Sequence, residues 1–156
     1  LFILWKSQLM TTSSLPKSDP SRVVYLVDDD EEDAILFEMA IHEIIPNCRL
    51  RIFYNGLILL EVLADPAAKP HLIFLDMHMP YPDGLEILMN LKINRQWADI
   101  PVIMLTGVED VDKISLAYQL GAQSVIEKPS THSQLLDVVI SIREYWFKTV
   151  RLPGQA

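Results

Sequence analysis

The chain has a single cysteine, five glycines and no long apolar run among its 156 residues. One cysteine, Cys48, excludes an internal disulfide framework and a multi-cysteine zinc site. A bilayer span needs about 20 consecutive apolar residues, and the apolar stretch at residues 1–5 is shorter than the core of a secretory signal, about 7–15 residues. We therefore predict a cytoplasmic protein with no membrane segment.

Basic residues are also scarce. Lys and Arg number 13 against 21 Asp and Glu, so the formal net charge is −8. A general nucleic-acid binder needs a cationic face, and anionic lipid likewise attracts basic segments, so neither partner is expected. Hydrophobic residues make up 50% of the chain, which excludes disorder for its bulk.

The length suits one folded domain. We predict that residues 1–21 form an N-terminal arm outside the folded domain, because residues 11–21 are rich in Ser, Thr and Pro. Residues 1–9 precede Met10, an alternative start. We interpret them as sequence upstream of the native protein, and the alternative is a short amphipathic arm that packs on a neighbour. The folded domain is expected over residues 22–150, followed by a tail at 151–156.

Within that domain, short apolar runs alternate with segments of helical periodicity. The helix expected from about residue 31 has Phe37, Ala40, Ile41 and Ile44 on one face and stops before Pro46. Strands are expected at residues 23–27, 50–54, 72–75, 102–105 and 124–127, and further helices at 57–63, 84–94, around 114–121 and from 131 onward.

The last helix opens with Thr131 and Gln134 at the spacing of a capping box. Its predicted core stripe comprises Leu135, Val138, Val139, Ile142 and Trp146, whereas Leu136, Ile140 and Phe147 are expected to lie off that stripe, as a possible partner surface.

Five strand–helix units in alternation predict an α/β fold with a parallel sheet covered on both faces. Right-handed crossovers make such a sheet doubly wound. Its functional site is expected at the carboxyl ends of the strands.

Polar residues stand at those strand ends. Asp28, Asp29 and Asp30 follow the first strand, and Asp76 follows the third. Because clustered carboxylates repel each other, they need a cation, a proton or solvent. Oxygen ligands in a shallow site favour Mg²⁺, with Mn²⁺ as a possible substitute.

The remaining strand ends suit phosphoryl chemistry. A carboxylate beside Mg²⁺ could attack phosphorus and become an aspartyl phosphate. Lys128 could neutralise the phosphoryl oxygens, and Thr106 offers them a hydroxyl donor. Gly107, without a side chain, leaves the approach open.

Four motifs occur in order along the expected elements: YLVDDDEED, IFLDMHMPYPDG, VIMLTG and VIEKP. With them the sequence, over about residues 23–146, resembles the receiver domain of two-component response regulators, in particular the stand-alone chemotaxis type. The resemblance implies a flavodoxin-like (βα)5 fold with strand order 2-1-3-4-5.

The resemblance also implies residue roles. Asp76 would be the phosphoacceptor, Asp29 a direct metal ligand and Asp28 a supporting one through water. The main-chain carbonyl of His78 would complete the metal ligands, while Asp30 would cap a helix.

For the remaining motifs, the family pattern makes Thr106 the switch hydroxyl. Lys128 would be the phosphate-binding cation, before a cis bond to Pro129.

Three positions depart from the family pattern or modulate it. Val125 replaces the usual Tyr or Phe, which puts the usual aromatic readout in doubt. His78 and Val108 would flank the line of water attack. We expect Val108 to slow hydrolysis by crowding the path and the His78 ring to act as a lid over the phosphoryl group.

The resemblance implies a sensor histidine kinase or a histidine phosphotransfer protein as phosphoryl donor. It also implies a switch that catalyses only its own phosphorylation and dephosphorylation, as a monomer or weak homodimer through the last helices. Because the chain ends at Ala156, we expect a receiver without an output domain.

Three alternatives stay open. A phosphatase of the aspartate-nucleophile type would need an Asp where His78 stands, and a flavodoxin-type FMN carrier would need a phosphate loop where the Asp run stands. A degenerate receiver acting as a scaffold would need none of Asp29, Asp76, Thr106 and Lys128.

Overall fold

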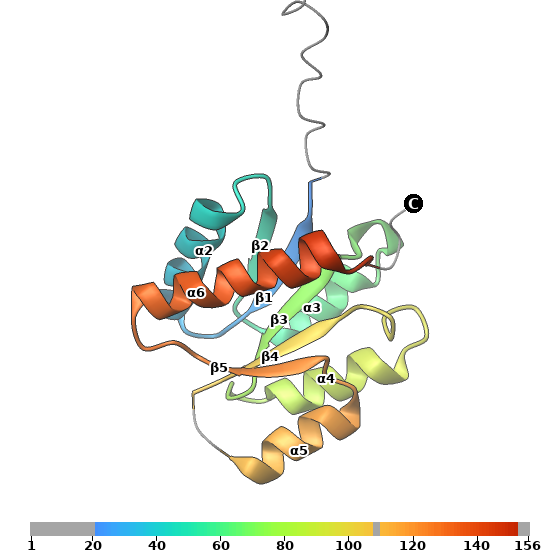
Figure 1. Ribbon diagram of the computed structural model, residues 1–156. Coiled ribbons are helices and arrows are strands. Elements are labelled where there is room, and N and C mark those ends of the chain that lie inside the picture. Colours follow the sequence, from blue (N-terminus) through green and yellow to red (C-terminus); the bar gives the residue numbers. More distant parts are fainter. Residues whose placement is uncertain (1–20, 108–109, 153–156) are drawn as a thin grey trace, which may run out of the picture.

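A computed structural model describes residues 21–107 and 110–152. The strands form one parallel five-stranded sheet in the order β2-β1-β3-β4-β5 (Figure 1). Their bounds are β1 Val23–Val27, β2 Arg49–Phe53, β3 Leu72–Asp76, β4 Val102–Thr106 and β5 Ser124–Glu127. The predicted fold class and strand order are confirmed.

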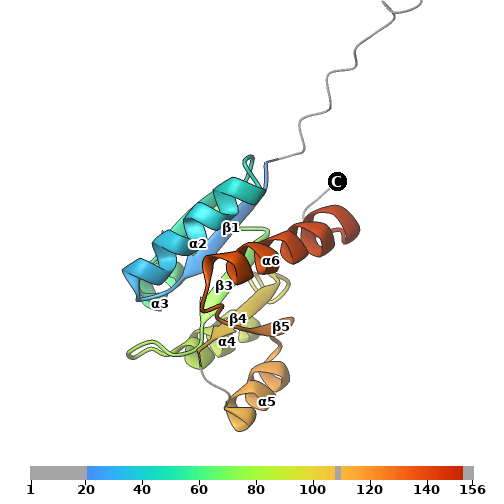
Figure 2. The same ribbon diagram turned by 60° about the vertical axis from the view of Figure 1, so that its left-hand side comes forward.

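Helices cover both faces of this sheet. They are α2 Glu31–Ile44, α3 Gly56–Leu63, α4 Gly84–Ile93, α5 Val111–Leu120 and α6 His132–Ile142, with a 3-10 turn η1 Pro66–Ala68 and a π-helix η2 Arg143–Thr149. Helices α2 and α6 share one face, and α3, α4 and α5 cover the other (Figures 1 and 2). None of the helices among the described residues has the length and apolar character of a membrane span.

The inner strands divide their side chains between two apolar layers. In β1, Tyr25 and Val27 pack toward α3 and α4, whereas Val24 and Leu26 pack toward α2 and α6. Successive residues of a strand point to opposite faces, so a strand buried on both faces is apolar throughout. That rule explains why the buried runs of β1, β3 and β4 were recognisable in the sequence.

Side chains cap the helices in the described part of the chain. Asp30 caps α2 by accepting from the backbone N–H groups of Glu32 and Asp33, as predicted. Thr131 accepts from the Gln134 N–H, but the Gln134 side chain accepts from Ser130, so the expected box is only half formed. A reciprocal capping box, not foreseen, joins Asp83 and Glu86 at the start of α4.

The predicted core stripe of the last helix is wrong beyond Ile142. Phe147 is buried, while Trp146 is only partly buried. The reason is the π-helix, in which backbone bonds run from i to i+5, as from Tyr145 to Val150. The next core-facing residue after Ile142 is therefore Phe147, five positions later, and not Trp146, four positions later. Val138, also placed on the stripe, is half-buried.

Tyr118 of α5 supports the edge strand β5. Half of its surface is exposed, and its hydroxyl accepts the backbone N–H of Val125 at 3.1 Å. Because β5 is an edge strand, that N–H has no ladder partner and a tyrosine at the rim of α5 supplies one.

Candidate functional site

Charged side chains meet where β1 and β3 end. Asp28 follows β1, Asp76 ends β3, and Lys128 follows β5. The chain leaves β1 for α2 on one face of the sheet, and leaves β3 for α4 on the other. This is the switch point at which doubly wound sheets leave a crevice for ligands.

Three carboxylates form a cluster in this crevice. Asp28, Asp29 and Asp76 each offer an oxygen, and the three oxygens lie within 4.8 Å of one another. Asp28 and Asp76 are buried, with 2% and 3% of their surface exposed, while Asp29 is exposed. All the potential ligand atoms of this cluster are carboxylate oxygens, and the cluster is open to solvent on one side. Like charges this close to one another fit a hard divalent cation.

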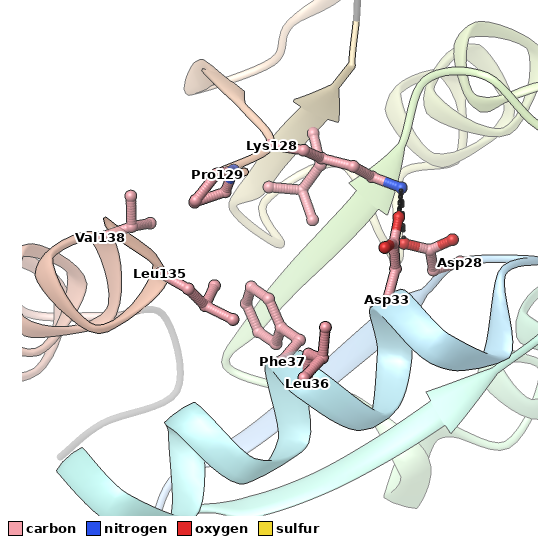
Figure 3. Close-up of a pocket in the computed structure, with 9 residues that line it drawn as sticks. Asp28, Asp33, Leu36, Phe37, Lys128, Pro129, Leu135 and Val138 are labelled. Atoms are coloured by element: carbon pink, nitrogen blue, oxygen red, sulfur yellow. Dashed lines mark hydrogen bonds and ion pairs between the residues drawn. The ribbon is translucent and has the colours of Figure 1, made fainter. Parts of the chain in front are cut away.

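The ammonium group of Lys128 contacts two carboxylates of this cluster and one carboxylate outside it. Its Nζ lies 2.8 Å from Oδ2 of Asp28, 3.0 Å from Oδ2 of Asp33 and 3.4 Å from Oδ2 of Asp76. Figure 3 shows the side chain extending from the loop after β5 toward Asp28 and Asp33. One ammonium is therefore shared by three carboxylates.

Two pKa shifts follow from this arrangement. Burial raises the pKa of Asp76 to about 6. The charge of Lys128 acts to lower this pKa, repulsion from Asp28 acts to raise it, and the backbone N–H of His78 acts to lower it. For Lys128, burial acts to lower the pKa, but the hydrogen bond and charge of Asp28 and the charge of Asp76 outweigh it and raise the pKa. Asp76 is thus ionised but destabilised at neutral pH, and Lys128 stays charged.

Backbone contacts hold the two buried carboxylates in place. The N–H of Asp30 donates to Oδ1 of Asp28 at 3.0 Å, and the N–H of His78 donates to Oδ1 of Asp76 at 3.2 Å. Behind Asp76, the start of α4 approaches so closely that a Cβ on Gly84 would lie 2.1 Å from the Asp76 carbonyl oxygen. Only glycine fits that contact.

The other predicted site residues are placed as follows. Thr106 ends β4 and is 3% exposed, and its carbonyl accepts the Lys128 N–H at 2.7 Å. A Cβ on Gly107 would meet no atom of the described residues within 4 Å, so packing among them does not require the glycine. Val125 is half-buried against the α3–α5 layer, and the His78 side chain is exposed. Val108 lies outside the described residues.

The cis bond expected between Lys128 and Pro129 is not found. Among the described residues, the cis peptide bond is Tyr81–Pro82. Since the trans form of an X-Pro bond is favoured by only about 0.5–1 kcal/mol, a Lys-Pro pair in a sequence does not decide the isomer.

Two residues of the site were missed from the sequence. Asp33 pairs with Lys128 although 95 residues separate them, and nothing in a run of acidic residues distinguishes this one from helix-dipole compensation. Gly84 follows Asp83, and an Asp-Gly pair is typical of an ordinary turn or helix cap. The position of Gly84, eight residues after Asp76, was the feature of the sequence that could have identified it.

A small cavity of about 60 Å³ lies beside the lysine (Figure 3). Asp28, Asp33 and Lys128 line its polar end. Its apolar walls come from both helices of this face and from the strand ends: Leu36, Phe37, Leu105, Pro129, Leu135 and Val138.

Comparison with known proteins agrees with this geometry. The family model described as response regulator receiver domain matches residues 24–140. Response regulator Rcp1 of Synechocystis sp. is 30% identical over 143 residues, which cover 88% of this chain and 97% of Rcp1. The probable methanogenesis regulatory protein FilR2 of Methanothrix harundinacea is 30% identical over 91% of this chain and 94% of its own.

Solved structures give the same relationship. The phosphorylated cyanobacterial phytochrome response regulator RcpA superposes with a TM-score of 0.79 at 29% identity, over 86% of this chain and 99% of RcpA. The Mn²⁺-bound form of Rcp1 superposes with a TM-score of 0.77 at 29% identity, over 85% and 99%. The acidic cluster, set beside a metal-bound relative, fits divalent metal binding of the receiver type. The chain therefore belongs to the response regulator receiver family and is a phosphoryl-accepting domain of two-component signal transduction.

Proposed function

We propose that Asp76 is the phosphoacceptor of this receiver. The observation that carries the proposal is the position of Asp76 at the end of β3, where Nζ of Lys128 is 3.4 Å away and the carboxylates of Asp28 and Asp29 lie in the same cluster. Asp76 therefore has both a cation and a candidate metal site beside it.

The proposed reaction is a phosphoryl transfer to a carboxylate. An Oδ atom of Asp76 forms a bond to phosphorus, the bond from phosphorus to a histidine nitrogen of the donor breaks, and the donor nitrogen keeps the electron pair. The pKa of about 6 leaves Asp76 ionised at pH 7, as a nucleophile must be. Lys128 is placed to neutralise phosphoryl oxygens.

A divalent cation completes the proposed site. We assign Mg²⁺, which oxygen ligands in a water-accessible site favour, to Asp28, Asp29 and Asp76, with Mn²⁺ as its substitute. When bound, it would supply positive charge against the phosphoryl oxygens. The main-chain carbonyl of His78 stays a predicted fourth protein ligand.

Thr106, Gly107 and Val125 keep the switch and modulating roles predicted for them. His78 keeps its predicted role as a lid over the phosphoryl group, for which its exposed ring leaves freedom to turn.

The proposed partners are a sensor histidine kinase or a histidine phosphotransfer protein as donor. Relatives in this family include the sporulation initiation phosphotransferase F of Bacillus subtilis, 34% identical over 54% of this chain and 65% of its own. We propose that the protein catalyses no reaction besides its own phosphorylation and dephosphorylation, and that it is a monomer or a weak dimer through its last helices. Its cytoplasmic location remains a prediction.

The proposal is tested by intact-protein mass after incubation with acetyl phosphate and Mg²⁺. The native protein should gain the mass of one phosphoryl group, and Asp76→Asn should gain none. Asp30→Asn is the matched control, because Asp30 caps α2 outside the carboxylate cluster and Asn is an equally good cap. Full labelling of Asp76→Asn would refute the assignment.

A further inference from the structure

The ammonium of Lys128 has three carboxylate partners: it donates hydrogen bonds to Asp28 and Asp33 and forms a longer ion pair with Asp76. An ammonium group has three N–H donors, and Asp28, Asp33 and Asp76 lie 2.8, 3.0 and 3.4 Å from Nζ. A phosphoryl group on Asp76 would bring further oxygens to the same ammonium. Bonding to phosphorus takes the negative charge from the Asp76 carboxylate, so the phosphoryl oxygens replace it as the third partner. A lysine drawn toward these oxygens must lengthen its hydrogen bond to Asp28 or to Asp33.

The three partners differ in how readily water can replace the lysine. The side chains of Asp28 and Asp76 are 3% and 5% exposed, whereas that of Asp33 is 48% exposed. A buried carboxylate that loses its cation keeps an uncompensated charge, which is strongly destabilising. An exposed ion pair contributes little and is readily replaced by solvent. Asp33 is therefore the partner that yields at the lowest free energy.

We propose that Asp33 is a positioning residue that competes with the phosphoryl group for Lys128. In the unphosphorylated protein it holds the lysine on the first turn of α2, and phosphorylation of Asp76 draws the lysine away from it. This inference rests on the proposed role of Asp76 as phosphoacceptor.

The position of Asp33 gives the exchange a structural consequence. Asp33 lies three residues after the cap of α2, and with Lys128 it borders the polar end of the cavity between α2 and α6 (Figure 3). Release of the lysine leaves this end of the cavity without its bridge from α2 to the loop after β5. The contact between Asp33 and Lys128 thus belongs to the unphosphorylated state alone, and it opposes phosphorylation.

The test uses beryllofluoride as a phosphoryl analogue, at saturating Mg²⁺, on the full chain. Removing the competing carboxylate in Asp33→Asn should tighten beryllofluoride binding by about two- to fivefold, the range of an exposed ion pair. Asp33→Glu keeps the charge and should bind as the native protein does. Glu32→Gln is the matched control: it removes the same charge from the same turn, and Glu32 makes no ion pair in the part of the chain that the structure describes.

The outcomes separate competition from general electrostatics. Equal tightening in Glu32→Gln and Asp33→Asn would overturn the proposal, because any lost negative charge would then favour an anion. Unchanged or weaker binding in Asp33→Asn would overturn it as well. If the native protein and Asp76→Asn respond alike to beryllofluoride and acetyl phosphate, the proposed function itself fails; if only the native protein responds and Asp33→Asn matches it, the inference alone fails.

Discussion

The two ends of the sheet differ in their balance of charge. At the amino ends of the strands, His71 Nδ1 accepts from the Val23 N–H, and Arg22 and Lys92 donate to backbone carbonyls. The ion pair there, Lys69 with Asp99, joins one cation to one carboxylate. At the carboxyl ends, charged side chains pair with each other and carboxylates are in excess. The amino end is closed by its own bonds, whereas the carboxyl end keeps a charge imbalance that a ligand can relieve.

Asp76 at the carboxyl end and His71 at the amino end have pKa values shifted in opposite directions. The pKa of Asp76 is raised, chiefly by burial, so the folded protein binds that proton more tightly than the unfolded chain. The stability contributed by this group therefore rises as pH falls from about 7 toward about 4. The pKa of His71 is lowered, by burial and then by the charge of Arg22, so its contribution is present above the unfolded value of 6.5 and is lost as pH falls below it.

The largest expected effect on stability comes from Gly84, where α4 meets the backbone of Asp76. Gly84→Ala places a Cβ 2.1 Å from the Asp76 carbonyl oxygen and should lower the free energy of unfolding by about 3 kcal/mol, in the range of overpacked cores. Urea denaturation measures it. Gly107→Ala, where an added Cβ meets no atom within 4 Å, is the control and should change stability by less than about 0.5 kcal/mol. Equal effects would mean that α4 does not press on Asp76.

A smaller effect should come from removing the strained charge. In metal-free buffer at pH 7, Asp76→Asn should raise the free energy of unfolding by about 2 kcal/mol, because it removes a carboxylate whose burial raises its pKa. The gain should shrink as pH falls, since the native side chain then becomes protonated. Parallel denaturation curves at pH 7 and pH 4 measure the difference. A gain that is independent of pH would contradict the electrostatic explanation.

Mg²⁺ should relieve the same imbalance by binding. At about ten times its dissociation constant, a ligand of the folded state adds about 1.4 kcal/mol of stability, which thermal denaturation with and without EDTA would show. Asp29→Asn should lose most of this gain, because Asp29 is one of the three clustered carboxylates. Glu31→Gln, outside the cluster, should keep it. An unchanged gain in Asp29→Asn would place the ion elsewhere.

The smallest effect should come from the amino end. His71→Ala leaves the Val23 N–H without its acceptor and should lower stability by about 1 kcal/mol at pH 8, with a smaller loss at pH 5. The exposed His42 is the control, and His42→Ala should be nearly neutral. Phosphoryl labelling should be unchanged in both. A labelling defect in His71→Ala would show that the two ends of the sheet are coupled.

Much of this fold was predictable because its patterns are local. The β1, β3 and β4 runs are apolar on both faces, and Asp30 is followed by an amphipathic helix. Polar site residues stand at the ends of β1, β3, β4 and β5. A period of two residues for strands and of 3.6 for helices needs no knowledge of distant contacts. The convergence of Asp28, Asp76 and Lys128 then follows from a parallel sheet alone.

Only the tertiary structure decided which neighbours share that site. Asp33 is one of four acidic residues in succession after Asp29, and only its place on the first turn of α2 brings it to a lysine 95 residues away. Gly84 is required because α4 meets the backbone of Asp76. The π-helix moves Phe147 into the core. These features depend on distances between elements, and a linear pattern records spacing along the chain but not the separation of surfaces that pack against each other.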